Sequence, residues 1–327
     1  MFKRALWFGL IACTLLSCDN ELNVTADWKD IPIVYGILSP VDSLHYIRIE
    51  KAFLDPTTSA LEQAQIADSF YYASLDAVIV DVASGERFQL EEIDGNLEGL
   101  VRDEGTFAAS PNLLYRVTQD DIRLKANQRY RLEINRSDRL PLVTAETVIT
   151  QKPQIKRPFF QELLRFQYPN QFKVLWQEAE NAFFYDVRLI FHYAETDPDN
   201  QGELIEKSLN WRIARNVTFS EVEILGITFY EYLRAELEAS PSINRVFRAI
   251  DVEVQSGGLE LFEFRKIQQA NTGITSVGGD IPQYTNLSEG LGILTSSNSD
   301  LEKGYELHPE TMDSLRFGSI TGPLNFQ

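Results

Sequence analysis

Few residues in this sequence carry side chains that bind metals or act as nucleophiles. The 327 residues include 2 Cys and 3 His, and the histidines at 45, 192 and 308 are far apart. None of them belongs to the His-x-His or His-Glu-x-x-His patterns that zinc hydrolases use. His45 and His192 fall in β-like runs and are interpreted as strand-face residues. The Gly-x-Ser-x-Gly turn of many hydrolases is also missing. A Ser–His–Asp triad stays open, because its members meet only in the fold.

The densest run of oxygen ligands lies between residues 196 and 203. Asp197, Asp199 and Gln201, followed by Gly202, have the spacing that opens a calcium-binding loop. The bidentate acid that closes such a loop is missing, because Ser208 occupies its place. Turn-forming residues alone account for a solvated hairpin here. We therefore expect no cofactor and no metal, with calcium as the weaker alternative.

The first residues have the layout of an export signal. Lys3 and Arg4 precede a mostly apolar stretch over 5–16. That stretch is too short to cross about 30 Å of hydrocarbon as a helix. A signal peptide over 1–17 is therefore favoured over a transmembrane anchor.

The end of that signal resembles the bacterial lipobox. It reads Leu15-Leu16-Ser17-Cys18. The resemblance implies cleavage between Ser17 and Cys18 and a diacylglyceryl group on the Cys18 thiol, which would hold the protein to a membrane. An ordinary secreted protein with an incidental Cys18 is the alternative. Residues 18–30 are polar and are interpreted as the lipidated Cys and a tether.

The overall charge narrows the class of partner. With 48 acidic and 30 basic residues, the formal net charge is −18. Phosphate neutralisation needs clustered Lys and Arg, so nucleic acid is excluded as a partner. Anionic lipid repels such a surface, which leaves membrane attachment to the acyl chains. Cys18 would be the remaining cysteine after cleavage, so stability must come from burial rather than from a disulfide.

The pattern of the chain predicts a mainly β protein of two sandwich domains with short helical insertions. Runs of β-branched and aromatic residues recur with little helix between them, as in β-sandwiches. The expected domains are a sandwich over 31–151, a linker over 152–158, and a second sandwich with a C-terminal extension over 159–327. In the first, strands are expected at 31–38, 44–50, 77–82, 87–90, 114–117, 129–134 and 144–149.

Three aromatic residues link these sandwiches to known folds. Leu124 lies six residues before Tyr130, which resembles the tyrosine corner of immunoglobulin-like domains, where the hydroxyl bonds to upstream backbone. Trp176, a polar turn and the strand around Tyr185 resemble strands B and C of fibronectin type III domains. The resemblance implies immunoglobulin-like and fibronectin type III-like folds, with structural roles for Tyr130, Trp176 and Tyr185.

The later part of the chain is less regular. Residues 229–237 follow helical spacing, whereas 259–269 fit a helix or a strand equally well. The tail from Gly278 is rich in Gly, Ser, Asn and Thr, and we expect loops and edge strands there. Gly290 and Gly292 are interpreted as a turn, because a phosphate cradle needs a following helix.

The order of these features resembles a Bacteroidota-type outer-membrane lipoprotein family of unknown function. The lipobox, the strand at 130–134 and the run from Tyr284 to Leu294 carry the resemblance. Members are often encoded beside TonB-dependent receptors. The resemblance implies a lipid-anchored protein of the outer membrane, facing either side, with no catalytic residues to transfer.

Three hypotheses about function follow. The first is a non-catalytic binding or docking module, accessory to an outer-membrane β-barrel transporter. The second is a glycan-binding or adhesive protein, because the sequence has 20 Phe, 13 Tyr and 4 Trp. The third and weakest is a hydrolase with an unrecognised site. Ser43 and Ser314, each in an Asp-Ser-Leu run, also fit a short O-glycosylation acceptor pattern.

Overall fold

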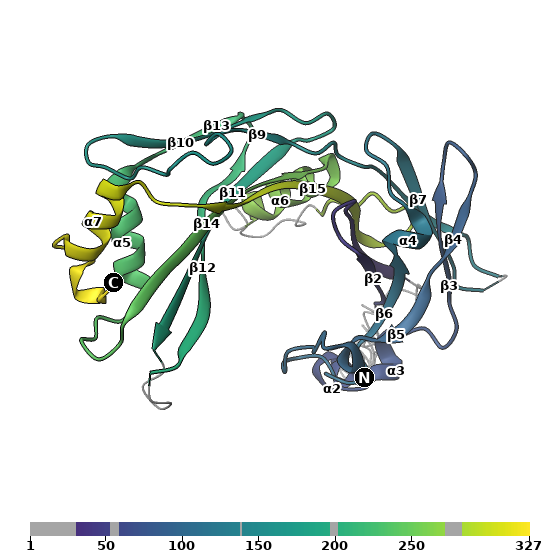
Figure 1. The fold of residues 1–327 in the computed structure, drawn as a ribbon. Coiled ribbons are helices and arrows are strands. Elements are labelled where there is room, and N and C mark those ends of the chain that lie inside the picture. Colours follow the sequence, from purple (N-terminus) through teal and green to yellow (C-terminus); the bar gives the residue numbers. More distant parts are fainter. Residues whose placement is uncertain (1–30, 53–58, 138, 197–201, 272–282) are drawn as a thin grey trace, which may run out of the picture.

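The computed structural model describes residues 31–52, 59–137, 139–196, 202–271 and 283–327. The chain is mainly β, with an eight-stranded sheet, two smaller sheets and short helices (Figure 1). In spatial order, the large sheet contains β12 (Leu204–Val217), β11 (Phe184–Thr196), β14 (Arg245–Gly257), β15 (Leu291–Tyr305), β1 (Pro32–Leu38), β2 (Leu44–Lys51), β6 (Leu113–Thr118) and β5 (Glu91–Asp94).

The smaller sheets each pack on one end of the large one. The four-stranded sheet contains β4 (Arg87–Gln89), β3 (Asp76–Asp81), β7 (Arg129–Asn135) and β8 (Val143–Val148). The three-stranded sheet contains β13 (Glu221–Leu225), β10 (Gln171–Gln177) and β9 (Gln154–Arg157). The helices are α2 (Ala60–Ala64), α3 (Ala67–Phe70), α4 (Gln119–Ile122), α5 (Gly226–Glu236), α6 (Leu259–Asn271) and α7 (Pro309–Phe317), with 3-10 turns at Gly95–Glu98 and Gly322–Leu324.

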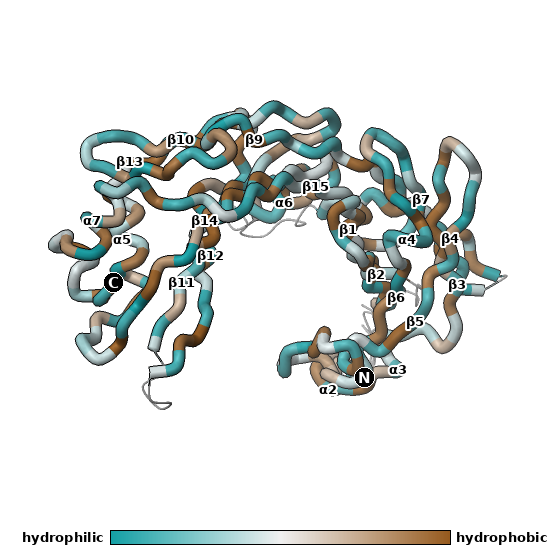
Figure 2. Tube along the Cα trace, in the orientation of Figure 1, coloured by the Kyte–Doolittle hydropathy of each residue, from teal (hydrophilic) through white to brown (hydrophobic). Residues whose placement is uncertain are grey.

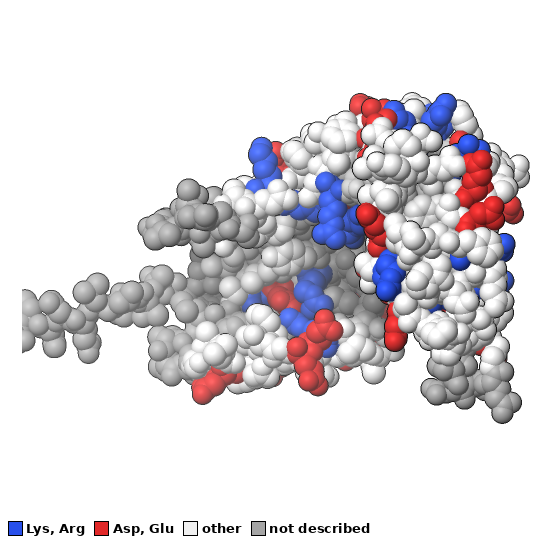
Figure 3. Space-filling view, turned by 90° about the vertical axis from the view of Figure 1, so that its left-hand side faces the viewer, with Lys and Arg blue, Asp and Glu red and all other residues white. Residues whose placement is uncertain are grey.

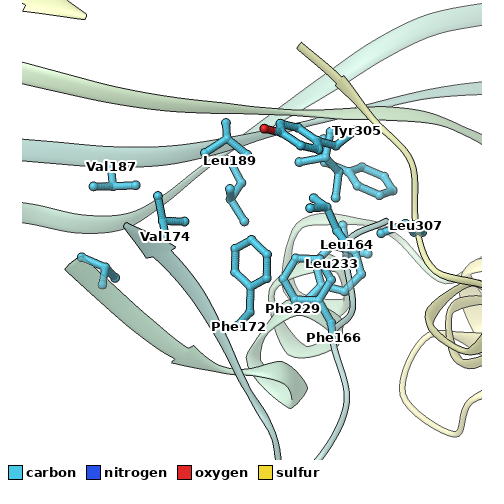
Figure 4. Packing of buried hydrophobic residues seen from close by; sticks show 14 of the residues in the cluster. Leu164, Phe166, Phe172, Val174, Val187, Leu189, Phe229, Leu233, Tyr305 and Leu307 are labelled. Carbon is cyan, nitrogen blue, oxygen red and sulfur yellow. The ribbon is translucent and has the colours of Figure 1, made fainter. Parts of the chain in front are cut away.

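Two hydrophobic cores result from this packing. In the N-terminal lobe, the four-stranded sheet covers β1, β2 and β6, and buries residues such as Val34, Ile47 and Leu132. In the C-terminal lobe, the three-stranded sheet and α5 cover β11 and β14. The rings of Phe166 and Phe229 stack there with centroids 4.2 Å apart (Figure 4). Alternation along each strand sends every second side chain into these cores.

Strand β15 joins the two lobes. Its first part, Leu291–Ser296, runs parallel to β1, and Ser297–Tyr305 runs antiparallel to β14. Leu294 is buried in the N-terminal core and Tyr305 in the C-terminal core. The expectation of loops and edge strands was therefore wrong for Leu291–Tyr305, which is a central strand. The polar residues that suggested loops are buried in the middle of the sheet.

The buried polar side chains of β15 hold the chain between the lobes. Ser296 Oγ donates to the carbonyl of Val148 (2.7 Å) and accepts from the N–H of Thr150 (3.2 Å). Asn298 Nδ2 donates to the carbonyl of Thr150 (2.9 Å). Buried backbone groups need such partners, so β15 fixes the connection as well as the sheet.

The segment 152–158, expected to be an extended linker, includes β9. Its Ile155 N–H donates to Asp300 Oδ2 (2.8 Å), and Lys152 Nζ lies 2.7 Å from Asp300 Oδ1. The segment is extended, but β10 and β15 hold it in place by hydrogen bonds.

Helices α5 and α6 show how local pattern and tertiary context combine. Residues 229–237 were expected to be helical, and α5 covers Gly226–Glu236. Residues 259–269, which fitted either state, form part of α6 and lie against β15. In the described part of the chain, none of the helices has the length and apolar character needed to cross a membrane.

Candidate functional site

A hollow of about 490 Å³ opens where β1, β2 and α6 meet, on the sheet face away from the N-terminal core. The hollow is lined mainly by apolar and aromatic side chains, among them Tyr35, Ile37, Leu44, Tyr46, Leu261, Phe264 and Ile293. Figure 2 shows β1 as one of the apolar segments at the inner side of the arch formed by the two lobes. Concave sites with such linings are typical of ligand and partner binding.

Strand β1 serves both the core and the hollow. Val34 and Leu38 are fully buried, whereas Tyr35 and Ile37 are 45 % and 47 % exposed. A half-solvated strand would normally carry polar side chains on its outer face. The outer face of β1 is apolar instead, which is typical of a binding surface. The sequence analysis did not predict this surface.

Helix α6 is fixed as one wall of the hollow by polar contacts. The Leu261 N–H donates to Thr295 Oγ1 on β15 (3.3 Å). Glu260 accepts from Thr147 Oγ1 (2.9 Å) and Thr295 Oγ1 (3.3 Å), so one carboxyl joins α6 to β8 and β15. Burial of this carboxyl raises the pKa of Glu260 above its ordinary value.

Two arginines at the rim of the hollow are paired within the chain. Arg48 contacts Glu50 (3.1 Å) and Asn112 (2.8 Å). Arg116 pairs with Glu98 and, on β5, with Glu91. On the molecular face in Figure 3, Lys and Arg likewise lie beside Asp and Glu. These two arginines therefore already have partners, and apart from the exposed carboxylate of Asp42 the lining that is left for a ligand is mainly apolar.

Tyr46 is one of the polar residues that line the hollow. Its hydroxyl donates to Glu98 (3.4 Å). Partial burial, and then the charge of Glu98, raise the pKa of Tyr46. The phenol therefore stays protonated near neutral pH and is a hydrogen-bond donor rather than a nucleophile.

A second hollow, of about 440 Å³, lies between α5 and α7 in the C-terminal lobe. Tyr230 lines it, but its hydroxyl already donates to the carbonyl of Phe166 (2.7 Å). Ser314, a predicted glycosylation site, also lines it, and its hydroxyl donates to the carbonyl of Glu310 (2.9 Å). Ser43, the other predicted site, is exposed in the turn between β1 and β2.

The two tyrosines singled out in the sequence have matching backbone contacts. Tyr130 is buried, and its hydroxyl accepts from the Lys125 N–H (3.2 Å). Tyr185 is also buried, and its hydroxyl accepts from the Ala179 N–H (2.8 Å). The ring of Trp176 lies 5.3 Å from that of Tyr185 in the C-terminal core. These contacts are structural rather than catalytic.

Other predicted site residues lie outside the described residues. These are Ser17 and Cys18 at the expected cleavage site, and Asp197, Asp199 and Gln201 in the run that resembles a calcium loop. Within the described ranges, no group of three or more His, Cys, Asp and Glu side chains is arranged to hold a metal.

His45 and His308 occupy structural positions. His45 on β2 is 1 % exposed, and its Nε2 lies 2.9 Å from Gln119 Oε1. Burial lowers the pKa of His45, so the ring is neutral at physiological pH. His308 is the N-cap of α7, where its Nδ1 accepts from the Glu310 N–H (3.3 Å).

His192 is the histidine whose neighbours most resemble those of a catalytic histidine. Its Nε2 lies 2.9 Å from Asp251 Oδ2, across strands β11 and β14. Ser208 on β12 is directly opposite His192 in the sheet. The structure thus brings the three side-chain types of a triad onto neighbouring strands. Among the described contacts, no hydrogen bond joins Ser208 to His192.

A domain of unknown function, DUF4249, matches residues 75–302. The chain belongs to this family. The DUF4249 region begins at β3 and ends within β15, so β1 and β2 precede it. The hollow is therefore built partly by the family region and partly by strands ahead of it. No curated protein matched the sequence.

Similarity to solved structures is weak. The C-terminal globular domain of an oligosaccharyltransferase from Pyrococcus abyssi is 11 % identical, with a TM-score of 0.23. The match covers 69 % of this chain and 46 % of that chain, which is less than half of its length. CBD12 from CALX1.2 is 11 % identical with a TM-score of 0.20, over 83 % of this chain and 100 % of that chain. Neither similarity supports an argument about function.

Proposed function

We propose that the chain is a lipid-anchored, non-catalytic binding module of the bacterial cell envelope, whose hollow beside α6 docks an apolar segment of an envelope protein. The observation that carries this proposal is the outer face of β1. Tyr35 and Ile37 expose nearly half of their surface there, although the same strand fills the N-terminal core. Exposed apolar surface in a concave site marks a place where a partner removes it from water.

The chemistry of the hollow selects the partner. Burying apolar surface stabilises a complex by about 25 cal/mol per Å². Arg48 and Arg116 are already paired with Glu50 and Glu98, so an anionic partner gains little from them at the rim. The segment that fits best therefore presents aliphatic or aromatic side chains.

The location proposed for this module is the outer membrane. Its support is the lipobox-like sequence that ends in Ser17 and Cys18, and the net charge of −18, which disfavours direct contact with anionic lipid. A β-barrel transporter of the TonB-dependent class is the proposed partner. Within this proposal, the lobes are immunoglobulin-like and fibronectin type III-like sandwiches, supported by the hydroxyl contacts of Tyr130 and Tyr185.

The test is affinity purification of the full chain from solubilised envelopes. The wild-type chain should recover an outer-membrane β-barrel, whereas Ile37→Asp should lose it, because a charge in the hollow opposes apolar docking. Phe160→Asp is the matched control, since Phe160 is 76 % exposed in the C-terminal lobe. Equal recovery by Ile37→Asp, or no barrel with the wild type, would contradict the proposal. Circular dichroism verifies that both variants fold.

The lipid anchor has its own test. Intact mass spectrometry of the chain from envelopes should show an N-terminal Cys18 that carries acyl chains. Cys18→Ser should move the protein from the membrane fraction to the soluble fraction. An unmodified Cys18 would remove the anchor from the proposal but leave the hollow unaffected.

A glycan is the second candidate ligand, and one observation favours it. Tyr35, Tyr46 and Phe264 surround the hollow, and the rings of Tyr35 and Phe264 lie 6.3 Å apart at 75°. Aromatic rings that are partly exposed bind the apolar faces of sugars. Affinity electrophoresis in polysaccharide gels would detect retardation that Tyr35→Ala reduces. Equal mobility with and without polysaccharide would exclude this ligand class.

A further inference from the structure

A long strand at the edge of the large sheet has a free side. β12 is the last strand in the spatial order, so β11 is its partner on one side and no described strand pairs with the other. In Figure 1, β11 and β12 run together to the lower end of the C-terminal lobe. Antiparallel pairing uses alternate backbone groups, so the remaining N–H and C=O groups of β12 point to the open edge.

This edge lacks two of the features that usually prevent strand pairing, a proline and an irregular register. The first five residues of β12 are exposed, including Leu204 (44 %) and Ile205 (41 %). Its register with β11 is regular from Leu204 to Arg212, and the irregular pairings lie beyond that stretch. The strand contains no Pro, and the ammonium of Lys207 is paired with Glu195. Long, regular, partly apolar edges form new strand pairs readily.

The sequence of β12 complements itself. A twofold axis at Leu209 would place Glu206 of one copy opposite Arg212 of the other, twice. It would also place Ile205 opposite Ile213 and Ser208 opposite Asn210. With the axis at Ser208, Glu206 faces Asn210. With the axis at Asn210, Glu206 faces Ala214. Among these three registers, the one centred on Leu209 pairs opposite charges, and cross-strand pairs of this kind stabilise sheets.

The charged groups in these pairs lie at the surface. Arg212 is exposed, and no ion pair involves it in the described part of the chain. Glu206 is 64 % exposed at its side chain, although it also accepts from Arg248 on β14. We propose that two copies of this chain associate by antiparallel pairing of their β12 edges about Leu209. The two large sheets then become one continuous sheet.

The experiment is sedimentation velocity of the full chain in detergent, over a range of protein concentrations. The wild type should form dimers. Arg212→Glu should weaken the dimer by at least about tenfold, because two attractive cross-strand pairs become repulsive. The double variant Glu206→Arg with Arg212→Glu should restore dimerisation, since each pair is then reversed. Arg234→Glu, which makes the same charge change on an exposed position of α5, should have no effect.

Hydrogen exchange separates this edge from any other interface. Amides of residues 204–214 should gain protection as protein concentration increases, and should lose it in Arg212→Glu. A monomer at every concentration would overturn the proposal, as would a dimer that Arg212→Glu leaves unchanged. Protection of 204–214 that appears only with solubilised envelope would assign the edge to another protein and overturn self-pairing. Circular dichroism confirms that the variants are folded.

Discussion

At the scale of single residues, Gly292 shows how much one position constrains the fold. Its φ is +101°, and a Cβ placed there would lie 1.9 Å from the carbonyl oxygen of Val34. Gly292 was interpreted as part of a turn. It lies instead in β15, directly beside β1, where two backbones approach too closely for any side chain.

Gly292→Ala should lower the free energy of unfolding by about 2–4 kcal/mol, because the new methyl group forces β1 and β15 apart. Gly304→Ala is the matched control in the same strand. Gly304 has a φ of +82° but no atom within 4 Å of its Cβ position. That variant should cost about 1–2 kcal/mol from backbone strain alone. Urea denaturation measures both, and equal costs would show that the close approach is unimportant.

Glu260 should give stability a pH dependence. Its pKa is raised in the folded chain, chiefly by burial, so the folded state holds this proton more tightly than the unfolded state. The stability that the protonated carboxyl contributes is fully present below pH 4.5, its ordinary pKa, and is lost as pH rises through the raised pKa. Glu260→Gln should remove this loss.

Urea denaturation at a series of pH values measures the Glu260 effect. The free energy of unfolding of the wild type should fall relative to Glu260→Gln as pH rises above 4.5, and the difference should then level off. Glu263→Gln, on the same helix, is the control. Parallel pH profiles for the wild type and Glu260→Gln would refute the prediction.

At the scale of elements, β15 both pairs within the large sheet and holds the connection between the lobes. It pairs with β1 and β14, and its side chains satisfy the backbone between β8 and β9. Ser296→Ala should therefore cost about 1–3 kcal/mol, because the Thr150 N–H and the Val148 carbonyl lose their partner in a buried place.

The control for Ser296→Ala is Ser299→Ala. Ser299 is on the same strand, half-buried, and its side chain makes no hydrogen bond in the described structure. Chemical denaturation gives the two stability changes, and hydrogen exchange at residues 148–152 shows whether the connection loosens. Similar, small changes in both variants would mean that the polar contacts of β15 contribute little.

Elements with a strong local pattern were the ones that sequence predicted well. The strands expected at 44–50 and 129–134 correspond to β2 and β7, and the helical spacing at 229–237 to most of α5. β15 was missed because its polar residues resemble a loop, and the tertiary partners that make a buried polar strand stable do not appear in local sequence. The hollow was missed for the same reason, since it combines β1 with the distant α6.

At the scale of the whole molecule, the shared sheet should couple the two lobes. β15 contributes Leu294 to one core and Tyr305 to the other. Leu132→Ala, in the N-terminal core, should cost about 2–4 kcal/mol. It should shift the unfolding of the C-terminal lobe by the same amount, because neither lobe keeps its sheet without β15.

Two probes measure this coupling. Trp176 is buried in the C-terminal lobe and reports on it by fluorescence, whereas far-ultraviolet circular dichroism reports on the whole chain. The two transitions should coincide in the wild type and move together in Leu132→Ala. A fluorescence transition that stays in place would show that the lobes unfold independently.

The parallel pairing of β1 with β15 also determines when the N-terminal part of the sheet can be completed during synthesis. Residues 32–38 leave the ribosome early, but the strand that completes their side of the sheet is made more than 250 residues later. Until β15 is made, one side of β1 has no strand partner, and the N-terminal part of the large sheet stays incomplete. The N-terminal lobe can therefore be completed only after the closing strand has been made, late in synthesis.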